Sequence, residues 1–285
     1  MQLKDSLATA IARLATEKVP SPRMNAESLL MFTLSRDRAY LFAHPERELT
    51  TDEQSRYEAV LAERARGMPA QYITGHQEFW GMDFIVTPAV LIPRPETEHV
   101  IETILELRTA EVRGPRSEVC LVDVGTGSGC IALALAKELR SAEIHATDIS
   151  PAALEIARAN AARHQLDQRI HFHQTDLLRG LDGEFDLVVS NPPYVGESEE
   201  DLVQLEVRKF EPRSAVFAGP TGTEVIARLI PQAREVLRPG GWLVMEISGT
   251  ITEEVLQLLE GWQDVQIKTD LQSIPRVVQA RKPTS

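Results

Sequence analysis

The sequence predicts an α/β protein in which a small all-α N-terminal domain is joined by a β-hairpin to a doubly wound, mostly parallel sheet of seven strands. Two observations support this. Before residue 70, apolar residues recur at helical spacing and no strand pattern interrupts them. From residue 119 onward, short apolar runs alternate with amphipathic stretches, which is typical of strands that alternate with helices around a parallel sheet.

The N-terminal helices are predicted over residues 3–14 and 26–34, with Pro20 and Pro22 between them. Residues 51–54 (Thr-Asp-Glu-Gln) are predicted to form a capping box for a third helix, which ends near Arg66. No motif in this region carries chemistry. Two interpretations therefore remain, a helical domain without a further role and a domain that docks a partner.

Residues 79–86 alternate in polarity and contain glycine, which predicts the hairpin between the domains. We expect the domains to span 1–74, 75–95 and 96–285. Pro95 is predicted to open a helix with the apolar stripe Val100, Ile101, Ile104 and Leu105. The helix dipole accounts for Glu96 and Glu98 in its first turn, but a cation is unfavourable there, so Arg94 is left without an explanation.

After a polar linker over 108–118, the elements alternate regularly. Strands are predicted at 119–124, 143–147, 170–174, 185–189, 242–247, 265–269 and 276–280. Helices are predicted at 130–139, 151–164, 224–237 and 252–259, while 197–211 is a longer connection without an assigned element. Such a sheet binds ligands at the carboxyl ends of its strands.

Composition narrows the function. Residues 1–70 contain 10 Lys and Arg against 10 Asp and Glu, and the remainder contains 20 against 32, which accounts for the net charge of −12. An acidic main body disfavours a nucleic-acid substrate, because such affinity comes largely from Lys and Arg contacts with phosphates. We expect no membrane segment and no secretory signal. Cys120 and Cys130 are expected to be buried small residues in a cytoplasmic protein.

Residues 122–129 (Val-Asp-Val-Gly-Thr-Gly-Ser-Gly) form a glycine-rich turn between a predicted strand and helix, typical of a nucleotide cradle. The spacing is neither that of the dinucleotide fingerprint, whose last glycine is replaced by Cys130, nor that of a P-loop. Asp123 would repel phosphate but could hold a cationic amine, which indicates an adenosine ligand bearing an amino acid. A tight turn without any ligand remains the alternative.

Two further acids follow predicted strands. Asp148 lies 19 residues after Gly129, where an acid commonly holds a ribose hydroxyl pair. Ser150 and Pro151 can cap the next helix without it, so Asp148 is expected to have no structural role of its own. Asp176 could accept a hydrogen bond from an adenine amino group, or it could cap a loop.

Residues 190–194 (Ser-Asn-Pro-Pro-Tyr) end another strand. Pro192 and Pro193 donate no N–H and stiffen the turn, so its carbonyls remain available as acceptors. Asn191 adds a side-chain carbonyl and Tyr194 an aromatic ring. This cluster suits a planar amino group.

Other candidates are weaker. His171 and His173 share one strand face, but no third ligand is spaced nearby, so no metal site is predicted. The acidic run at 197–201 is either a solvated face or a contact for a basic loop of a protein substrate.

The glycine turn together with the Asn-Pro-Pro-Tyr turn resembles the class I S-adenosylmethionine-dependent methyltransferases that modify planar amino groups. Further segments resemble the PrmC/HemK family of glutamine N5-methyltransferases, and the similarity spans nearly the whole chain. They are residues 71–75, 78–80, 91–98, 210–213 and 274–278. The string Pro-Arg-Pro-Glu-Thr-Glu at 93–98 fits the branch that acts on release factors better than the branch that acts on ribosomal proteins.

This resemblance implies a Rossmann-like class I methyltransferase fold, S-adenosylmethionine as cofactor and the glutamine of the Gly-Gly-Gln motif in class I peptide chain release factors as substrate. It also implies a release-factor-docking role for the N-terminal domain. Cofactor-binding positions would be Gly125, Thr126, Gly127, Ser128, Gly129, Asp148, Asp176, Leu177 and Asn191. The glutamine would meet Asn191, Pro192, Pro193 and Tyr194, of which Asn191, Pro192 and Tyr194 would be catalytic. Leu177 departs from relatives that have an aromatic residue there.

Two acceptors, the Asn191 side-chain oxygen and the Pro192 carbonyl, would take the two amide hydrogens, so positioning rather than a strong base would supply most of the rate. Three alternatives stay open: methylation of adenine N6 in nucleic acid, methylation of a ribosomal-protein glutamine, and a non-catalytic binding module.

Overall fold

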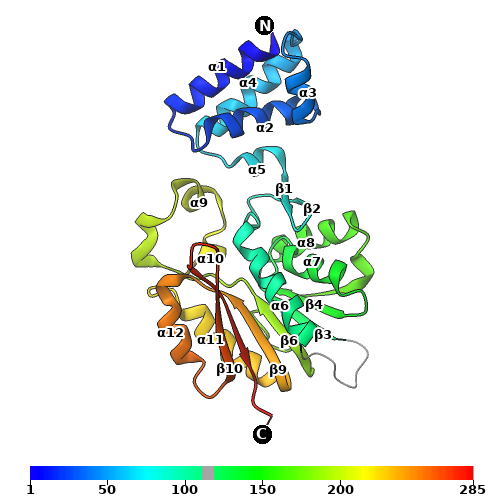
Figure 1. Cartoon of the computed structure of the whole chain (residues 1–285), viewed down its shortest axis with the longest axis vertical. Coiled ribbons are helices and arrows are strands. Elements are labelled where there is room, and N and C mark those ends of the chain that lie inside the picture. Colours follow the sequence, from blue (N-terminus) through cyan, green and yellow to red (C-terminus); the bar gives the residue numbers. More distant parts are fainter. Residues whose placement is uncertain (111–118, 285) are drawn as a thin grey trace. The chain divides into compact units, whose positions relative to one another are not determined.

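The computed structural model describes residues 1–110 and 119–284, so most of the predicted polar linker lies outside the described residues. The chain divides into two compact units (Figure 1). The first comprises Met1–His76 together with Leu205–Phe210, and the second comprises Gln77–Gln204 and the residues from Glu211 onward.

The first unit is helical, as the sequence predicted, and is built around a core that includes Leu14, Leu29, Leu30 and Tyr57. Its helices are α1 (Leu3–Thr16), α2 (Pro22–Leu34), α3 (Arg38–Ala43), α4 (Thr51–Ala65), α5 (Ala70–Thr74) and α9 (Leu205–Phe210). The short helices α3 and α5 were not predicted.

The capping box of α4 begins one residue earlier than predicted. The Thr50 hydroxyl accepts a hydrogen bond from the Glu53 N–H at 3.2 Å, and the Glu53 carboxylate accepts one from the Thr50 N–H at 2.9 Å. Both Thr50 and Thr51 are followed three residues later by Glu or Gln, so the pattern fits two registers. The observed register is the one with Glu53, whose carboxylate has two acceptor oxygens, three residues after the capping residue Thr50.

Helix α9 joins the first unit although it lies about 140 residues further along the chain. The buried guanidinium of Arg64 forms an ion pair with Glu206 at 2.7 Å and donates to Asn25 Oδ1 at 2.7 Å. A buried charge is tolerated only when it is paired and hydrogen-bonded, and Glu206 supplies that pairing. Residues 197–211, to which no element was assigned, therefore contain a helix with a defined position in the first unit.

The predicted hairpin is present as β1 (His76–Phe79) and β2 (Met82–Ile85). Within the second unit, the fully buried side chain of Asn160 in α8 (Pro151–Arg163) fixes the end of β2. Asn160 Nδ2 donates to the carbonyls of Ile85 at 3.0 Å and Ser128 at 2.9 Å, while its Oδ1 accepts from the Ile85 N–H at 2.7 Å. One amide thus connects the hairpin, a helix and the glycine turn.

The second unit contains the predicted seven-stranded sheet, in the order β10-β11-β9-β6-β3-β4-β5. Its strands are β3 (Cys120–Val124), β4 (Glu143–Asp148), β5 (Ile170–Gln174), β6 (Phe185–Ser190), β9 (Leu237–Glu246), β10 (Gln263–Thr269) and β11 (Pro275–Arg281). Only β11 runs antiparallel to its neighbours, β9 and β10, so the sheet is mostly parallel as predicted.

Helices cover both faces of this sheet (Figure 1). The helices α6 (Glu98–Ala110), α7 (Cys130–Glu138) and α8 pack on one face, and α11 (Glu224–Val236) and α12 (Thr252–Leu258) pack on the other. Burial on both faces explains why β3 and β6 read as continuous apolar runs rather than alternating ones. The strand order reverses between β3 and β6, and a ligand crevice is expected at that point.

Several short elements were not predicted. They are the 3-10 turns η2 (Asp167–Arg169), η3 (Glu197–Leu202) and η4 (Gly249–Ile251), together with α10 (Arg213–Val216), β7 (Val195–Gly196) and β8 (Phe217–Gly219). The helix predicted from Pro95 is present and begins with the 3-10 turn η1 (Pro95–Thr97), which leads directly into α6. Among the described residues, no helix is both long enough and apolar enough to cross a bilayer.

Candidate active site

A cavity of about 340 Å³ opens at the carboxyl ends of the parallel strands, beside the point where the strand order reverses. Strand-end residues that line it are Gly125, Thr126, Gly127, Ser128, Asp148, Ile149, Ser150, Thr175, Asp176, Leu177, Asn191 and Pro193. The segment before α6 contributes Ala89, Val90, Leu91, Pro93, Arg94 and Thr97, and other segments contribute Cys130, Ile131, Ala153, Pro212, Ser214, Ala215, Phe217, Val225 and Arg228.

Gly125 and Gly127 border this cavity with backbone φ angles of +72° and +54°. Apart from its chain neighbours, no described residue lies within 4 Å of a Cβ atom built at either position, so the space beside the turn is open. Glycine adopts this left-handed conformation without steric cost, and the missing side chains let a ligand approach the backbone closely. The turn therefore leaves room for a ligand beside its backbone, and cofactor binding at these glycines stays a prediction.

Gly129 has a different role from the other two glycines. A Cβ there would lie 2.8 Å from Leu133 Cδ1 and 3.3 Å from Ala157 Cβ, which is too close for normal packing. Gly129 is not among the described residues that line the cavity. It allows α7 and α8 to approach each other, and any contact of this position with a cofactor stays a prediction.

We expect Gly129→Ala to destabilise the protein by about 2–5 kcal/mol, because a left-handed alanine costs about 1–2 kcal/mol and an overpacked contact about 1–3 kcal/mol. Gly127→Ala is the matched control, since its Cβ meets no protein atom and only the backbone cost applies. Urea unfolding of the two variants measures the difference. Equal stabilities would contradict the packing role of Gly129.

Contrary to the expectation from the sequence, Asp123 does not line the cavity. Its side chain is fully buried beneath the turn, where Oδ2 accepts hydrogen bonds from the Thr126 hydroxyl at 2.6 Å and the Ala132 N–H at 3.2 Å. Burial raises the pKa of Asp123 to about 7. No described residue donates to Oδ1. The prediction that this carboxylate could hold a cationic amine is therefore replaced by a role in shaping the glycine turn.

Asp148 has a structural role that the sequence analysis denied it. Its Oδ2 accepts from the Gly127 N–H and its Oδ1 from the Ser150 N–H, both at 2.9 Å. Burial raises the pKa of this carboxyl group above its usual value. Because each carboxylate oxygen has a second lone pair, Asp148 can hold the turn and still accept from the hydroxyls of a bound ribose.

Ile149 was missed by the sequence analysis, although its position directly after the strand-end acid was a usable signal. It lines the cavity and remains 62% exposed. Leu177 lines the same cavity and has a left-handed backbone with a φ of +56°. Non-glycine residues in this conformation cluster at functional sites. Ile149 and Leu177 give the cavity apolar surfaces suited to a flat ring.

Asp176 also lines the cavity, and its carboxylate forms an ion pair with Arg228 of α11. Its main-chain carbonyl accepts from the Arg179 N–H at 3.3 Å, a bond that any residue could make, so the loop-capping role of the side chain stays a prediction. A contact with adenine stays a prediction.

Only two of the four residues of the Asn-Pro-Pro-Tyr turn line the described cavity. Asn191 and Pro193 line the cavity, whereas Pro192 is buried and Tyr194 packs against the apolar core. Asn191 Nδ2 donates to Thr97 Oγ1 at 3.0 Å, and the Tyr194 hydroxyl donates to Glu246 Oε1 at 3.0 Å. Burial, and next the charge of Glu246, raise the pKa of Tyr194, so its phenol stays protonated and cannot act as a base.

The fold explains Arg94, which lines the cavity and forms an ion pair with the buried carboxylate of Glu211. Glu211 also accepts from the Ile92 N–H at 3.2 Å, so it fixes the segment before α6. Cys130 also lines the cavity, but burial raises the pKa of its thiol to about 12. The thiol is therefore neutral and is no nucleophile.

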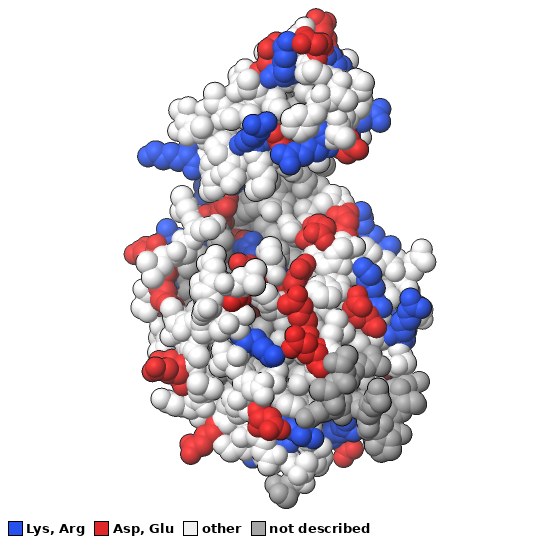
Figure 2. Space-filling model, in the orientation of Figure 1, with Lys and Arg blue, Asp and Glu red and all other residues white. Residues whose placement is uncertain are grey.

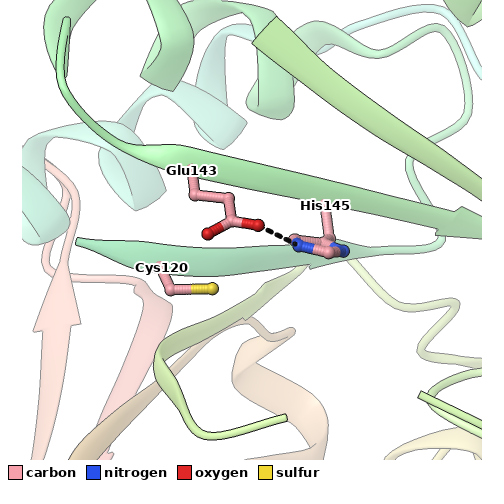
Figure 3. A group of neighbouring side chains, drawn as sticks. All are labelled: Cys120, Glu143 and His145. Atoms are coloured by element: carbon pink, nitrogen blue, oxygen red, sulfur yellow. Dashed lines mark hydrogen bonds and ion pairs between the residues drawn. The ribbon is translucent and has the colours of Figure 1, made fainter. Parts of the chain in front are cut away.

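A separate group of possible metal ligands consists of Cys120, Glu143 and His145 (Figure 3), whose ligand atoms lie within 4.8 Å of one another. From the sequence, no third ligand was found near His171 and His173. In the structure, His145 on β4 lies beside His173 on β5. The His145 ring nitrogens already form hydrogen bonds with His173 Nε2 at 2.9 Å and Glu143 Oε1 at 3.3 Å. None of these residues lines the described cavity, and the absence of a metal stays a prediction.

Two family models and two full-length relatives match this chain. Residues 5–75 match the family described as the PrmC N-terminal domain, and residues 107–208 match the one described as the methyltransferase small domain. The chain is 55% identical to the release factor glutamine methyltransferase of Koribacter versatilis, with all of both chains covered. It is 42% identical to that of Chlorobaculum tepidum over 95% of this chain and 94% of the relative.

Two solved structures show the same fold. The hMettl16 catalytic domain in complex with a MAT2A 3′UTR hairpin has a TM-score of 0.57 at 17% identity, covering 79% of this chain and 82% of that one. A methyltransferase from Pyrococcus furiosus has a TM-score of 0.50 at 21% identity, covering 80% and 99%. At these identities the likeness concerns the fold alone.

Proposed function

The chain belongs to the release factor glutamine methyltransferase family, and from this we propose that it methylates the side-chain amide nitrogen (N5) of the glutamine in the Gly-Gly-Gln motif of class I peptide chain release factors. The observation that carries the proposal is the 55% identity over the full length of both chains, which includes the N-terminal region as well as the methyltransferase unit. The same proposal places the enzyme in the cytoplasm, where release factors act.

The described residues fit S-adenosylmethionine as the cofactor. The open space beside Gly125 and Gly127 accommodates a ligand close to the backbone, and a volume of about 340 Å³ lies within the range of small-molecule sites. Asp148 would accept from the ribose hydroxyls, and Ile149 and Leu177 would cover the adenine. When bound, this cofactor supplies an electrophilic methyl group on a sulfonium ion.

The protein would act on the glutamine by orientation. An amide nitrogen is a weak nucleophile, because its lone pair is delocalised into the carbonyl group. The Asn191 side-chain oxygen and the Pro192 carbonyl would accept its two hydrogens and hold the nitrogen in line with the methyl group. The N–CH3 bond would form as the S–CH3 bond breaks, and the amide nitrogen would release one of its two hydrogens as a proton to solvent. Tyr194 and Cys130 stay protonated, so neither would take this proton as a base, and fixed dipoles would favour the transfer.

We propose that residues 1–74 dock the release factor, 75–95 link the domains and 96–285 carry out methylation. The first unit has nearly neutral composition and displays apolar side chains on its surface, which suits a protein partner. Met24, Phe32 and Phe42 are 64%, 44% and 59% exposed.

The charge distribution gives no support to a nucleic-acid substrate. On the face drawn in Figure 2, acidic side chains form a row over α6, where Glu98, Glu102 and Glu106 are spaced four residues apart. Such a row repels phosphates. Residues 71–285, which include α6, contain the whole excess of acidic over basic residues.

Labelled S-adenosylmethionine tests the proposal. The protein is offered a class I release factor, the same factor with Gln→Ala in its Gly-Gly-Gln motif, a ribosomal protein fraction, and RNA or DNA. We expect label on the wild-type release factor and none on the other substrates. Label on nucleic acid or ribosomal protein, or no label at all, would contradict the proposal.

A further inference from the structure

A chain of buried hydrogen bonds connects the two polar side chains of the Asn-Pro-Pro-Tyr turn. Asn191 Nδ2 donates to Thr97 Oγ1 at 3.0 Å, and Thr97 Oγ1 donates to Glu246 Oε2 at 2.6 Å. The other carboxylate oxygen of Glu246 accepts from the Tyr194 hydroxyl at 3.0 Å. Thr97 and Glu246 are only 1% and 2% exposed, so water does not compete for these bonds.

Three distant parts of the chain build this network. Thr97 ends η1, directly before α6, and Asn191 follows β6. Glu246 is the last residue of β9, which runs parallel to β6 with Met245 opposite Ser190. Asn191 and Glu246 therefore emerge at the same edge of the sheet, and Thr97 bridges them.

The direction of each hydrogen bond follows from the number of protons available. Burial raises the pKa of Glu246, and the hydrogen bonds from Thr97 and Tyr194 oppose that rise because they favour the ionised carboxylate. An ionised carboxylate only accepts, and in that state both Thr97 and Tyr194 donate to Glu246, as the structure has them. The Thr97 hydroxyl has one hydrogen, and after donating it the oxygen can only accept. Asn191 must therefore present its NH2 group to Thr97, which leaves Oδ1 as the atom available on the cavity side.

We propose that Thr97 and Glu246 are positioning residues that hold the Asn191 amide in the one orientation in which Oδ1, rather than Nδ2, meets the substrate. This inference rests on the proposed function, because only a substrate with N–H donors needs an acceptor at that point. With the amide reversed, Nδ2 would face the N–H groups of the glutamine, and two donors would repel each other. The same carboxylate fixes the ring of Tyr194 through its hydroxyl.

Thr97→Val and Thr97→Ser test the orientation. Valine keeps the shape but leaves the Asn191 NH2 without an acceptor, whereas serine keeps the hydroxyl. We expect kcat with a release factor to fall about 10- to 100-fold in Thr97→Val, since misplacing a reacting group by about 1 Å costs about 100-fold, and to stay within about threefold in Thr97→Ser. The Kd of S-adenosylmethionine should be unchanged in both variants.

Thr103→Val is the matched control. Thr103 lies on α6, is as buried as Thr97, and donates only to the His99 carbonyl of its own helix at 2.7 Å. We expect its kcat to be that of the wild type. A wild-type kcat in Thr97→Val, an equal loss in Thr97→Ser, or an equal loss in Thr103→Val would each overturn the proposal.

Glu246→Gln changes the polarity of the network while conserving its volume. Glutamine offers one acceptor and one NH2 group to two hydroxyl donors, so one of the hydrogen bonds must reverse or break. We expect a loss of kcat similar to that of Thr97→Val. Full activity in Glu246→Gln would overturn the requirement for a double acceptor.

A second measurement does not depend on methylation. The side-chain NH2 signal of Asn191, identified in ¹H–¹⁵N spectra by its loss in Asn191→Ala, should exchange slowly with solvent in the wild type and in Thr97→Ser and rapidly in Thr97→Val. Equal exchange in all three proteins would overturn the proposal. If the wild type does not methylate release factors but shows this exchange pattern, the proposed function fails while the orientation of Asn191 stands.

Discussion

Asn191→Ala is expected to reduce methyl transfer to a release factor by at least about 10²–10³-fold, the usual loss when one fixed polar group of a transition-state site is removed. The variant loses the acceptor for the glutamine amide, and Thr97 loses its donor. Binding of S-adenosylmethionine should survive, because the glycine turn and Asp148 are held by other contacts. Single-turnover methylation and calorimetry measure the two properties separately.

The control for this variant is its thermal stability, which should stay close to that of the wild type because Asn191 borders a cavity rather than the core. Turnover at the wild-type rate in Asn191→Ala would disprove the mechanism. If Asn191→Ala lost both cofactor binding and turnover, the main role of Asn191 would instead be to bind the cofactor, which is its other predicted role.

Asn160→Leu is expected to lower the free energy of unfolding by at least about 3 kcal/mol, because it leaves three polar groups without a partner and each such group costs about 1–3 kcal/mol. The substitution keeps the approximate volume but removes the partners of the Ile85 N–H and of the carbonyls of Ile85 and Ser128. Since Ser128 belongs to the glycine turn, the affinity for S-adenosylmethionine should fall as well. Urea unfolding and calorimetry measure both effects.

Asn25→Leu is the matched control for this prediction. Asn25 is also buried and also makes three hydrogen bonds, to the carbonyls of Pro20 and Ser21 and to Arg64, but it lies in the helical unit. It should destabilise the protein while leaving the cofactor affinity unchanged. If both variants lowered the affinity equally, the effect of Asn160 would not act through the glycine turn.

Local sequence patterns predicted the sheet and the position of the candidate site. The alternation of apolar runs and helical stretches identified the seven strands, since strand and helix periodicities differ over a few residues. The glycine turn and the Asn-Pro-Pro-Tyr turn were each recognised at a strand end, and parallel strands bring such ends to one edge. Several boundaries differ by one or more residues, as with the capping box of α4.

Sequence reasoning failed where a side chain meets a partner far along the chain. It left Arg94 unexplained, although Glu211 lies 117 residues away beside it. It gave Asp148 no structural role, because its partner is the N–H of Gly127 on the preceding turn. It did not consider His145 beside His173, since two adjacent strands carry them.

By itself, therefore, the sequence determined which turns this protein contains and which atoms they offer, because prolines, glycines and strand ends act over a few residues. The tertiary structure alone decided which way those atoms face. Thr97 and Glu246, separated from each other by 149 residues, meet only after η1 lies against the edge formed by β6 and β9. Their hydrogen bonds select the orientation of the Asn191 amide, and no local pattern encodes that choice.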